Sequence, residues 1–385
     1  MCKKNIVIYG ITGSIGDSAL KVIKAFPECF RLTACSAGKN IEKLNKILSD
    51  FPDIKKVCVA EDKDVEGVNT VSAEVFSGEE GLRELLEPAP DTALVALPGK
   101  QGWKLVVNAI EKRIPVALAN KEALVIAGTL MGRDVTTDRS RIVPVDSEHA
   151  ALIQLLENTI SSDRISSVYL TASGGAFRKM KKEDILSASP SDALNHPVWD
   201  MGKKVTVDSA TMVNKGLELM EAYWLFPVKP EQLDVIVHPQ VAAHAVVEYI
   251  DGSFVAQLAA SDMIIPVATG LSYPTMLPVA DRLPEAAYSY YGERHDFFSP
   301  DYDKYPLLKL AKELLVNRDY SGMVAFAIAD EVAVCNFLDG KCTVGDIYRV
   351  VGQSVNHFSN SSSPEKVEDM EVFIKDIENF TEKIL

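Results

Sequence analysis

The chain has 385 residues, of which 47% are hydrophobic and 24% are charged, a composition typical of soluble globular proteins. Its length exceeds what one ordinary hydrophobic core contains and favours two or three domains. The formal net charge of −14 argues against a general nucleic-acid-binding surface, so a ligand that carries phosphate would need a local cluster of donors.

The cysteines and the apolar runs indicate the cellular compartment of the protein. The 6 cysteines form no CxxC pair and no cluster with histidine, which indicates neither a zinc site nor a disulfide framework, and we expect a reducing cytoplasm. The N-terminus leads directly into a strand-like run, without the apolar segment of a signal peptide. No apolar run approaches the ~18 residues that cross a bilayer, so we expect no membrane segment.

The first motif is a glycine-rich turn between a strand and a helix. Residues 4–9 predict a buried strand, Gly10–Gly16 follow with the spacing GxxGxxG, and residues 17–26 have helical periodicity. This order is typical of dinucleotide binding, although the spacing is not GxGxxG and glycines in such turns are often structural. The motif alone therefore leaves both interpretations open.

The end of the second strand suggests which dinucleotide would bind. Residues 31–38 predict a strand, and an NAD site would place Asp or Glu at its end to bind the ribose 2′-hydroxyl. This chain has Gly38, Lys39 and Asn40 there instead. Because Lys39 could pair with a 2′-phosphate, NADP(H) is favoured over NAD(H).

Strands and helices continue to alternate, which predicts an α/β fold with a doubly wound, Rossmann-type parallel sheet. The strand-like runs are 56–60, 93–97, 115–119 and 142–145, with helical segments such as 40–50 and 102–112. Ligands of such sheets bind beyond the carboxyl ends of the strands. Two of these ends are polar, at 120–122 and at 146–149.

Each polar strand end has two interpretations. Lys121 could face a substrate, or it could be a helix-start residue paired with Glu122. Asp146 and Glu148 are two residues apart, which in an extended segment places both carboxylates on one side, as oxygen ligands for Mg²⁺ or Mn²⁺. Alternatively, Asp146 or Ser147 caps a helix at 149–158.

The pattern changes after residue 162. A strand at 168–172 ends in Ser173-Gly174-Gly175, where backbone could wrap a phosphate. Residues 187–204 show no regular pattern and carry His196, Trp199 and Met201, which is typical of a lid. The alternative is that Trp199 only anchors this loop to the core.

Residues 205–226 predict a turn followed by one helix. Ser209, Thr211, Asn214 and Lys215 supply donors just ahead of that helix, a plausible phosphate cradle. Glu218 and Glu221 are three residues apart, so their carboxylates share a helix face beside the cradle and suggest a metal. The alternative is a capped amphipathic helix with solvated carboxylates.

Further short strands follow this helix. Residues 235–237, 245–250 and 254–260 predict antiparallel strands, with a hairpin turn at 251–252. His238 and His244 are either active-site donors or structural histidines. Beyond a proline-containing stretch, helical spacing recurs at 306–317, 322–338, 344–358 and 364–384.

These patterns predict the following domains: an NADPH-binding Rossmann domain (1–149), a central α+β catalytic domain (150–271) with the lid, a linker (272–305) and a C-terminal helical domain (306–385).

With these motifs, the chain resembles the 1-deoxy-D-xylulose 5-phosphate reductoisomerase family. The resemblance is carried by GITGSIG (10–16), LANKEALV (118–125), PVDSEHAA (144–151), LTASGGAF (170–177), NHPVWDMGKKVTVDSATMVNKGLE (195–218) and HPQ (238–240). It implies a homodimeric enzyme that uses NADPH and Mg²⁺ or Mn²⁺ to isomerise and reduce this sugar phosphate to 2-C-methyl-D-erythritol 4-phosphate, in the non-mevalonate isoprenoid pathway. It implies no nucleic-acid or membrane partner.

The resemblance also implies a role for individual residues. Asp146, Glu148 and Glu218 match the metal ligands, and Lys121 matches the active-site lysine. Substrate contacts match Ser147, Ser173, His196, Ser209, Asn214 and Lys215, and the lid matches Trp199 and Met201. The NADPH contacts match Thr12, Gly13, Ser14, Ile15, Gly38, Lys39, Asn40, Asn120, Glu122 and Gly202.

Four segments depart from the family pattern, at 97–103, 241–245, 261–264 and 327–331. In the last of these the family usually has Asn-Ala-Ala-Asn-Glu, and this chain has Ala327-Ile-Ala-Asp330-Glu331. The departures leave open a paralogue that acts on a related ketose phosphate. A non-catalytic NADPH-binding regulatory protein is a third hypothesis, but it would need neither two carboxylate segments nor a lid.

Overall fold

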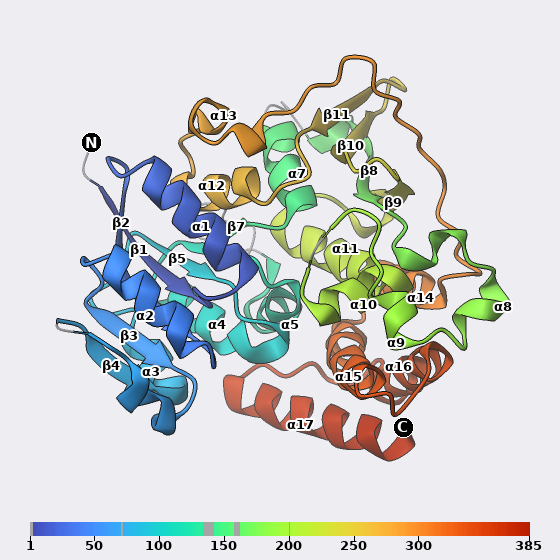
Figure 1. Cartoon of the computed structure of the whole chain (residues 1–385). Helices are drawn as coiled ribbons and strands as arrows, with labels where there is room; N and C mark the ends of the chain where they lie inside the picture. Colours follow the sequence, from blue (N-terminus) through green and yellow to red (C-terminus); the bar gives the residue numbers. More distant parts are fainter. Residues whose placement is uncertain (1–2, 71, 134–141, 158–161, 200) are drawn as a thin grey trace. The chain divides into compact units, whose positions relative to one another are not determined.

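The computed structural model describes residues 3–70, 72–133, 142–157, 162–199 and 201–385 (Figure 1). The chain divides into two compact units. Unit 1 comprises residues 1–123, 138–150 and 262–287, and unit 2 comprises 124–137, 151–261 and 288–385.

Unit 1 contains a seven-stranded parallel sheet in the order β4-β3-β2-β1-β5-β6-β7. The strands are β1 (Lys4–Tyr9), β2 (Phe30–Ala37), β3 (Lys56–Val59), β4 (Glu74–Ser77), β5 (Thr92–Val95), β6 (Val116–Leu118) and β7 (Ile142–Pro144). Strand order reverses between β1 and β5, as in doubly wound folds. The α/β prediction is therefore confirmed.

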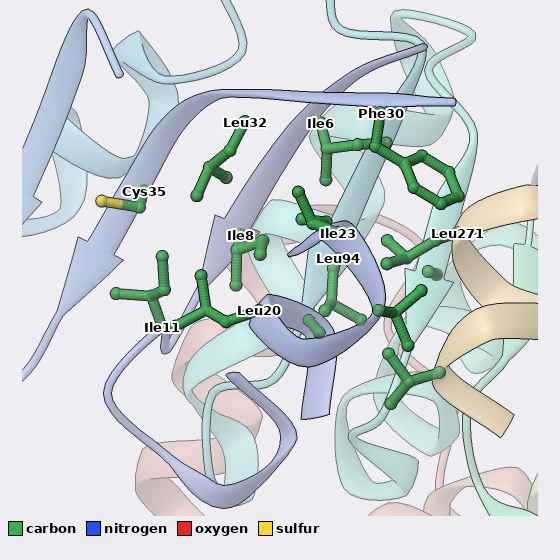
Figure 2. Close-up of a cluster of buried hydrophobic side chains, with 14 of the residues drawn as sticks. Ile6, Ile8, Ile11, Leu20, Ile23, Phe30, Leu32, Cys35, Leu94 and Leu271 are labelled. Atoms are coloured by element: carbon green, nitrogen blue, oxygen red, sulfur yellow. The ribbon is translucent and has the colours of Figure 1, made fainter. Parts of the chain in front are cut away.

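The centre of this sheet is buried on both faces. Residues 6–9 of β1 are all buried, which explains why this strand reads as a continuous apolar run and not as an alternating one. Figure 2 shows Leu20 and Ile23 of α1 (Ser14–Ala25) close to Ile8 and Leu94 of the sheet. Burial of this apolar surface is the main stabilising contribution in unit 1.

Other helices complete unit 1. They are α2 (Ile41–Asp50), α3 (Gly78–Glu84), α4 (Trp103–Glu111), the first residues of α5 (Lys121–Met131) and α7 (Ser147–Glu157), α12 (Ile264–Ser272) and α13 (Val279–Arg282), with the short 3₁₀ turns η1 (Asp62–Gly67), η2 (Gly99–Gly102) and η6 (Pro284–Ala286). β4 and α3 were not predicted from the sequence, because β4 has only four residues and α3 is short and polar. α12 packs against α1 and supplies Leu271 to the core, so part of the predicted catalytic domain lies in unit 1.

The predicted linker at 272–305 also contributes to this core. Val279 of α13 and Ala286 of η6 are buried in unit 1. Residues 288–305 belong to unit 2, where Phe298 forms an isolated bridge with Val237. Apolar positions between the prolines explain why this stretch packs instead of only crossing the surface.

Unit 2 contains a four-stranded mixed sheet in the order β11-β10-β8-β9. Its strands are β8 (Ile165–Ala172), β9 (Leu233–Val237), β10 (Ala243–Tyr249) and β11 (Phe254–Leu258). β10 is antiparallel to β8 and β11, as predicted, but β9 is parallel to β8. The antiparallel prediction is wrong for β9 because a long crossover, which includes α10 and α11, returns the chain in the same direction.

The segment predicted as one turn and one helix forms two helices, α10 (Lys203–Thr211) and α11 (Val213–Leu225). Met212 separates them with a left-handed backbone, at φ 63°. Ser209 and Thr211 therefore lie at the end of α10, just ahead of α11, whereas Asn214 and Lys215 lie inside α11 and not ahead of it. The Thr211 hydroxyl donates to the Val207 carbonyl at 3.1 Å, which makes Thr211 a structural residue.

The C-terminal helices agree closely with prediction. They are α14 (Pro306–Asn317), α15 (Tyr320–Leu338), α16 (Val344–Phe358) and α17 (Val367–Ile384). Contrary to our expectation that no run is long enough, α15 is long and apolar enough by composition to cross a bilayer. Because 72% of its most apolar window is buried inside the fold, we interpret it as a core helix.

Two short helices and three 3₁₀ turns complete the described part of unit 2: α8 (Lys182–Ile185), α9 (Pro190–Ala193), η3 (Ser162–Arg164), η4 (Ala176–Lys179) and η5 (Pro230–Gln232). α9 lies inside the predicted lid and begins with a capping box between Ser189 and Asp192. The lid segment therefore has structure of its own, which the sequence analysis did not predict. Asp200, also in this segment, lies outside the described residues.

Candidate active site

The glycine turn of unit 1 lies at the reversal of strand order. Gly10 has φ 84°, and a Cβ atom there would lie 2.5 Å from the Ala96 carbonyl oxygen, so only glycine fits. Its N–H donates to the Ser36 hydroxyl at 3.1 Å. These contacts hold the turn where the ends of β1, β2 and β5 meet, the usual position of a dinucleotide.

The N-terminus of α1 follows this turn. Gly13 is the residue before the helix, and no side chain caps it. Gly13 and Ser14 are exposed, whereas Thr12 and Ile15 are half-buried. The first N–H groups of a helix have no partner within the helix, so this end suits a pyrophosphate.

The end of β2 presents the predicted cofactor residues Gly38, Lys39 and Asn40, all of them exposed. The Asn40 side chain accepts a hydrogen bond from the Lys43 N–H at 3.0 Å and thereby caps α2. Asn40 therefore has a structural role in addition to its predicted one.

The sequence analysis did not single out Lys43. Its Nζ donates to the Thr12 carbonyl at 3.0 Å and pairs with Asp17 at 2.7 Å, which joins α2 to the glycine turn. A second cation thus lies at this turn. Its position in the first turn of the helix that follows Lys39 was the signal in the sequence.

The end of β6 is held by Asn120. Its side-chain amide donates to the carbonyls of Leu97 and Gly99, and its oxygen accepts from the Ala123 N–H at 2.9 Å. This buried residue therefore fixes one of the segments that departs from the family pattern and caps α5. Glu122, the next predicted cofactor residue, is also buried.

Lys121 pairs with the end of the neighbouring strand. Its Nζ lies 2.5 Å from Oδ2 of Asp146, and both side chains are nearly buried. Lys121 is the first residue of α5, as the helix-start interpretation expects, but its ammonium group also pairs with Asp146. β6 and β7 are adjacent and parallel, which brings the residues after both strands to one edge of the sheet.

Ser147 and Glu148 begin α7, two residues earlier than predicted. The Ser147 hydroxyl donates to Oε2 of Glu148 at 2.5 Å. Glu148 is thus in the first helical turn while Asp146 precedes the helix, so the extended-segment argument for their spacing does not apply. Carboxylate oxygens are nevertheless the ligands that Mg²⁺ prefers.

In unit 2, Ser173 and His196 contact each other. The Ser173 Oγ lies 3.0 Å from the His196 Nε2 and accepts from the Gly175 N–H at 3.1 Å. The Nδ1 of His196 accepts from the Trp199 N–H at 2.8 Å, so the ring proton resides on Nε2 and is donated to Ser173. Desolvation by burial lowers the pKa of His196 below its usual value, which favours this neutral form.

This arrangement orients the Ser173 hydroxyl. Because Oγ already accepts two hydrogen bonds, its own proton is available to a ligand. Gly175 packs against α10, where a Cβ atom would lie 2.3 Å from the Ser209 carbonyl oxygen. The turn after β8 and the half-buried Ser209 are therefore neighbours, as a phosphate cradle requires.

The first turn of α11 carries the remaining predicted donors. The Nζ of Lys215 lies 2.5 Å from Oε2 of Glu218, and the Asn214 amide donates to Oε1 of the same carboxylate. Glu218 is 1% exposed, and Glu221 is also buried. The alternative of solvated carboxylates on this helix is therefore contradicted.

Other predicted residues are half-buried or structural. Trp199 and Met201 are half-buried, and the exposed Gly202 precedes α10. His238 is buried: its Nε2 accepts from the Ala242 N–H at 3.1 Å and its Nδ1 lies 2.9 Å from the Asp296 carbonyl. His238 is thus a structural histidine, and His244 is likewise buried.

Sequence comparisons assign the chain to a family. Models described as 1-deoxy-D-xylulose 5-phosphate reductoisomerase, its C-terminal domain and the DXP reductoisomerase C-terminal domain match residues 6–128, 142–226 and 258–378. The reductoisomerase of Macrococcus caseolyticus is 39% identical over 94% of this chain and 95% of its own. That of Thermoanaerobacter pseudethanolicus is 40% identical over 94% of both chains. The chain belongs to the 1-deoxy-D-xylulose 5-phosphate reductoisomerase family.

Solved structures of reductoisomerases share the fold. A DOX-P reductoisomerase in complex with NADPH, fosmidomycin and magnesium is 33% identical, with a TM-score of 0.88 over 99% of this chain and 98% of that one. The Zymomonas mobilis enzyme in complex with NADPH is 32% identical, with a TM-score of 0.87 over 99% of both chains. The resemblance inferred from the motifs is therefore confirmed.

Two segments that depart from the reductoisomerase pattern contact each other. The Ser261 hydroxyl donates to the Val241 carbonyl at 2.9 Å, and Val241 has φ 53°. The substitutions at these two positions therefore lie within one local packing arrangement. Such neighbours commonly change together because each alters the environment of the other.

Proposed function

We propose that this chain converts 1-deoxy-D-xylulose 5-phosphate to 2-C-methyl-D-erythritol 4-phosphate, with NADPH and a divalent metal ion, in the non-mevalonate isoprenoid pathway. The observation that carries the proposal is the set of buried polar groups in unit 2, in a chain that matches reductoisomerases over 94% of its length. Ser173, His196 and Lys215 are partly or fully buried, and hydrogen bonds to their neighbours offset the cost of desolvation and fix the orientation of these side chains.

The proposed metal ligands are Asp146, Glu148 and Glu218. Each supplies hard carboxylate oxygens, and Glu148 and Glu218 are buried, which fits Mg²⁺ and also Mn²⁺. When bound, the metal ion supplies Lewis-acid polarisation of the substrate carbonyl and hydroxyl oxygens. Ser147 holds Glu148 through its hydroxyl and is also a proposed substrate contact.

The proposed catalytic cation is Lys121. Asp146 restricts the position of its ammonium group, so the three N–H donors point in defined directions. We propose that these donors stabilise negative charge that develops on a substrate oxygen. The low exposure of this pair strengthens the electrostatic interaction, because little water screens it.

The proposed phosphate cradle consists of Ser173, His196, Ser209, Asn214 and Lys215. The Nε2 proton of His196 and the hydroxyl of Ser173 form one chain of donors. Lys215 contributes the positive charge that a phosphate dianion requires in a protein with a net charge of −14. NADPH would bind along the glycine turn, the N-terminus of α1 and Lys39.

The two other hypotheses have less support. A paralogue for a related ketose phosphate was suggested by the departures, but the contact between Ser261 and Val241 is equally consistent with paired substitutions inside the fold. A regulatory NADPH-binding protein would not need the buried carboxylates of both units.

The direct test measures the loss of NADPH absorbance with Mg²⁺ or Mn²⁺ and 1-deoxy-D-xylulose 5-phosphate, next to a reaction without metal. Metal-dependent oxidation of NADPH is the expected result. A panel of ketose phosphates follows in the same assay. Preference for another sugar would favour the paralogue, and binding of NADPH without turnover of any sugar would favour the regulatory protein.

We also propose that the enzyme is a homodimer and that it is cytoplasmic. The dimer is argued from β11. β11 is the edge strand of its sheet, and its residues Phe254, Val255 and Leu258 are 60%, 44% and 40% exposed, as is typical of a strand that pairs with another chain. The cytoplasmic location is supported by free cysteines at 29, 35, 58, 335 and 342, which agree with a reducing compartment. Light scattering should report a dimer, and Val255→Lys should shift it toward monomer, whereas the exposed Val372→Lys on α17 should not. A monomeric wild-type chain would reject the proposal.

A further inference from the structure

The start of α10 is tied to the core helix α15 by an ion pair. The Nζ of Lys204 lies 2.9 Å from Oδ2 of Asp330 and 2.6 Å from Oδ2 of Asp208. Asp330 is 0% exposed and lies in the middle of α15, whereas Asp208 is one helical turn after Lys204 in α10. The pair therefore joins two helices of unit 2, which also pack against each other.

Lys204 lies where the predicted lid segment and α10 overlap. It is the last residue of the predicted lid segment and the second residue of α10, the helix that carries Ser209. The preceding Gly202 is exposed, and a Cβ atom there would meet no atom of the described residues within 4 Å. The backbone just before Lys204 is thus loosely packed, and the ion pair to Asp330 supplies a fixed point after it.

We propose that Asp330 is a positioning residue for the sugar phosphate site. Through Lys204, Asp330 fixes the carboxyl-terminal end of the lid segment and the first turn of α10 against α15. This arrangement holds the lid segment with His196, and Ser209 in α10, where the phosphate binds. The inference rests on the proposed function for its substrate.

The residue type at position 330 strengthens this argument. The family pattern given above has asparagine there, and this chain has an acid. An aspartate adds the attraction of opposite charges to the hydrogen bond from Lys204, whereas an asparagine carbonyl would accept that bond without a negative charge of its own. Because Asp330 is fully buried, its charge is costly without the partner Lys204. The pair therefore favours the one arrangement of α10 and α15 in which both groups meet.

Steady-state kinetics of Asp330→Ala test the role in substrate binding. Because α10 and the lid segment lose their fixed point, we expect KM for the sugar phosphate to rise about tenfold, with a smaller rise in KM for NADPH, since only Gly202 among the predicted cofactor contacts lies in this segment. Asp330→Asn retains an acceptor and should remain within about threefold of the wild type. The matched control is Asp339→Ala: Asp339 lies just after α15 and pairs with the exposed Lys341 at 2.8 Å, so both KM values should stay unchanged.

Hydrogen exchange measured by mass spectrometry gives a readout that does not depend on the substrate. In Asp330→Ala we expect exchange in 201–208 to accelerate about tenfold, with α16 and α17 unchanged. Equal acceleration throughout α16 and α17 would show that Asp330 only stabilises the helical core, and unchanged exchange in 201–208 would also overturn the proposal. If Asp330→Ala does not fold, Lys204→Met removes the same ion pair from its partly exposed partner.

The two proposals can fail separately. No turnover of any sugar phosphate by the wild-type chain would reject the proposed function, but the exchange experiment would still decide whether Asp330 fixes α10. Conversely, a wild type that turns over substrate, with an Asp330→Ala variant unchanged in KM for the sugar phosphate, would reject the positioning role alone.

Discussion

The Nε2 atom of His196 lies 3.0 Å from the Oγ atom of Ser173, and the opposite nitrogen of the same ring accepts the N–H of Trp199 at 2.8 Å. One imidazole thus joins the lid segment to the turn after β8. Because Trp199 provides a donor, Nδ1 must be the unprotonated nitrogen, and the ring proton is directed at the Ser173 hydroxyl.

The first prediction concerns the tautomers of two histidines. His196 should carry its proton on Nε2, whereas His238, whose Nε2 accepts the Ala242 N–H, should carry it on Nδ1 and donate to the Asp296 carbonyl. Long-range ¹H–¹⁵N spectra of histidine-labelled protein distinguish the two forms. The same tautomer in both residues would contradict the hydrogen-bond assignment of one of them.

The second prediction concerns pH. Burial lowers the pKa of His196, so between that pKa and the unfolded value of about 6.5 the unfolded chain binds the additional proton. The contribution of His196 to stability is therefore fully present above pH of about 6.5 and decreases as the pH falls below it. A ¹³C chemical-shift titration should place the midpoint of His196 below that of the same residue in urea. A higher midpoint in the folded protein would show that the charged form is stabilised instead.

The third prediction concerns Glu218. Glu218→Gln removes the charge from a buried, proposed metal ligand but keeps one acceptor oxygen for Lys215 or Asn214, so the protein should fold and bind NADPH normally. Turnover should fall by more than about 100-fold, because loss of a ligand costs at least as much as loss of its supporting groups. Glu313→Gln, on the exposed side of α14, is the control. Retained turnover would remove Glu218 from the metal site.

The fourth prediction concerns cofactor preference. Lys39→Ala should reduce the preference for NADPH over NADH by about tenfold, because a charge-assisted bond to the 2′-phosphate is lost. Lys46→Ala, an exposed residue of α2 paired with Glu42 at 2.8 Å, should leave the ratio of kcat/KM values unchanged. If Lys39→Ala leaves the NADPH to NADH ratio of kcat/KM unchanged, another cation recognises the 2′-phosphate, and Lys43 would be the first to test.

The fifth prediction concerns the packing of α5 on α11. A Cβ atom at Gly128 would lie 2.5 Å from the ring of the buried Trp224, so Gly128→Ala should destabilise the protein by about 1–3 kcal/mol. Gly352→Ala, in α16, would meet no atom within 4 Å and should be neutral or stabilising by up to about 1 kcal/mol. Thermal unfolding should therefore shift to lower temperature only in the first variant. Equal midpoints would mean that Trp224 moves at little cost.

Local patterns in the sequence were sufficient for much of the fold. β1, α1 and β2 follow from an apolar run, a glycine turn and a helical period, and all four C-terminal helices lie within a few residues of their predicted bounds. These features depend on contacts between residues near each other in the chain, where side-chain periodicity reports burial directly. The donors and acids of the candidate site were found in the same way, because their residue types limit the chemistry.

Only the tertiary structure decided how those residues are used. The pairing of Lys121 with Asp146, the parallel direction of β9 and the tie from Lys204 to Asp330 all join positions far apart in the chain. The break between α10 and α11 at Met212 is local, but it has no glycine or proline to signal it. Sequence patterns establish which groups can donate, accept or carry charge. Burial and pairing, which set their energies, depend on the neighbours that the folded chain brings together.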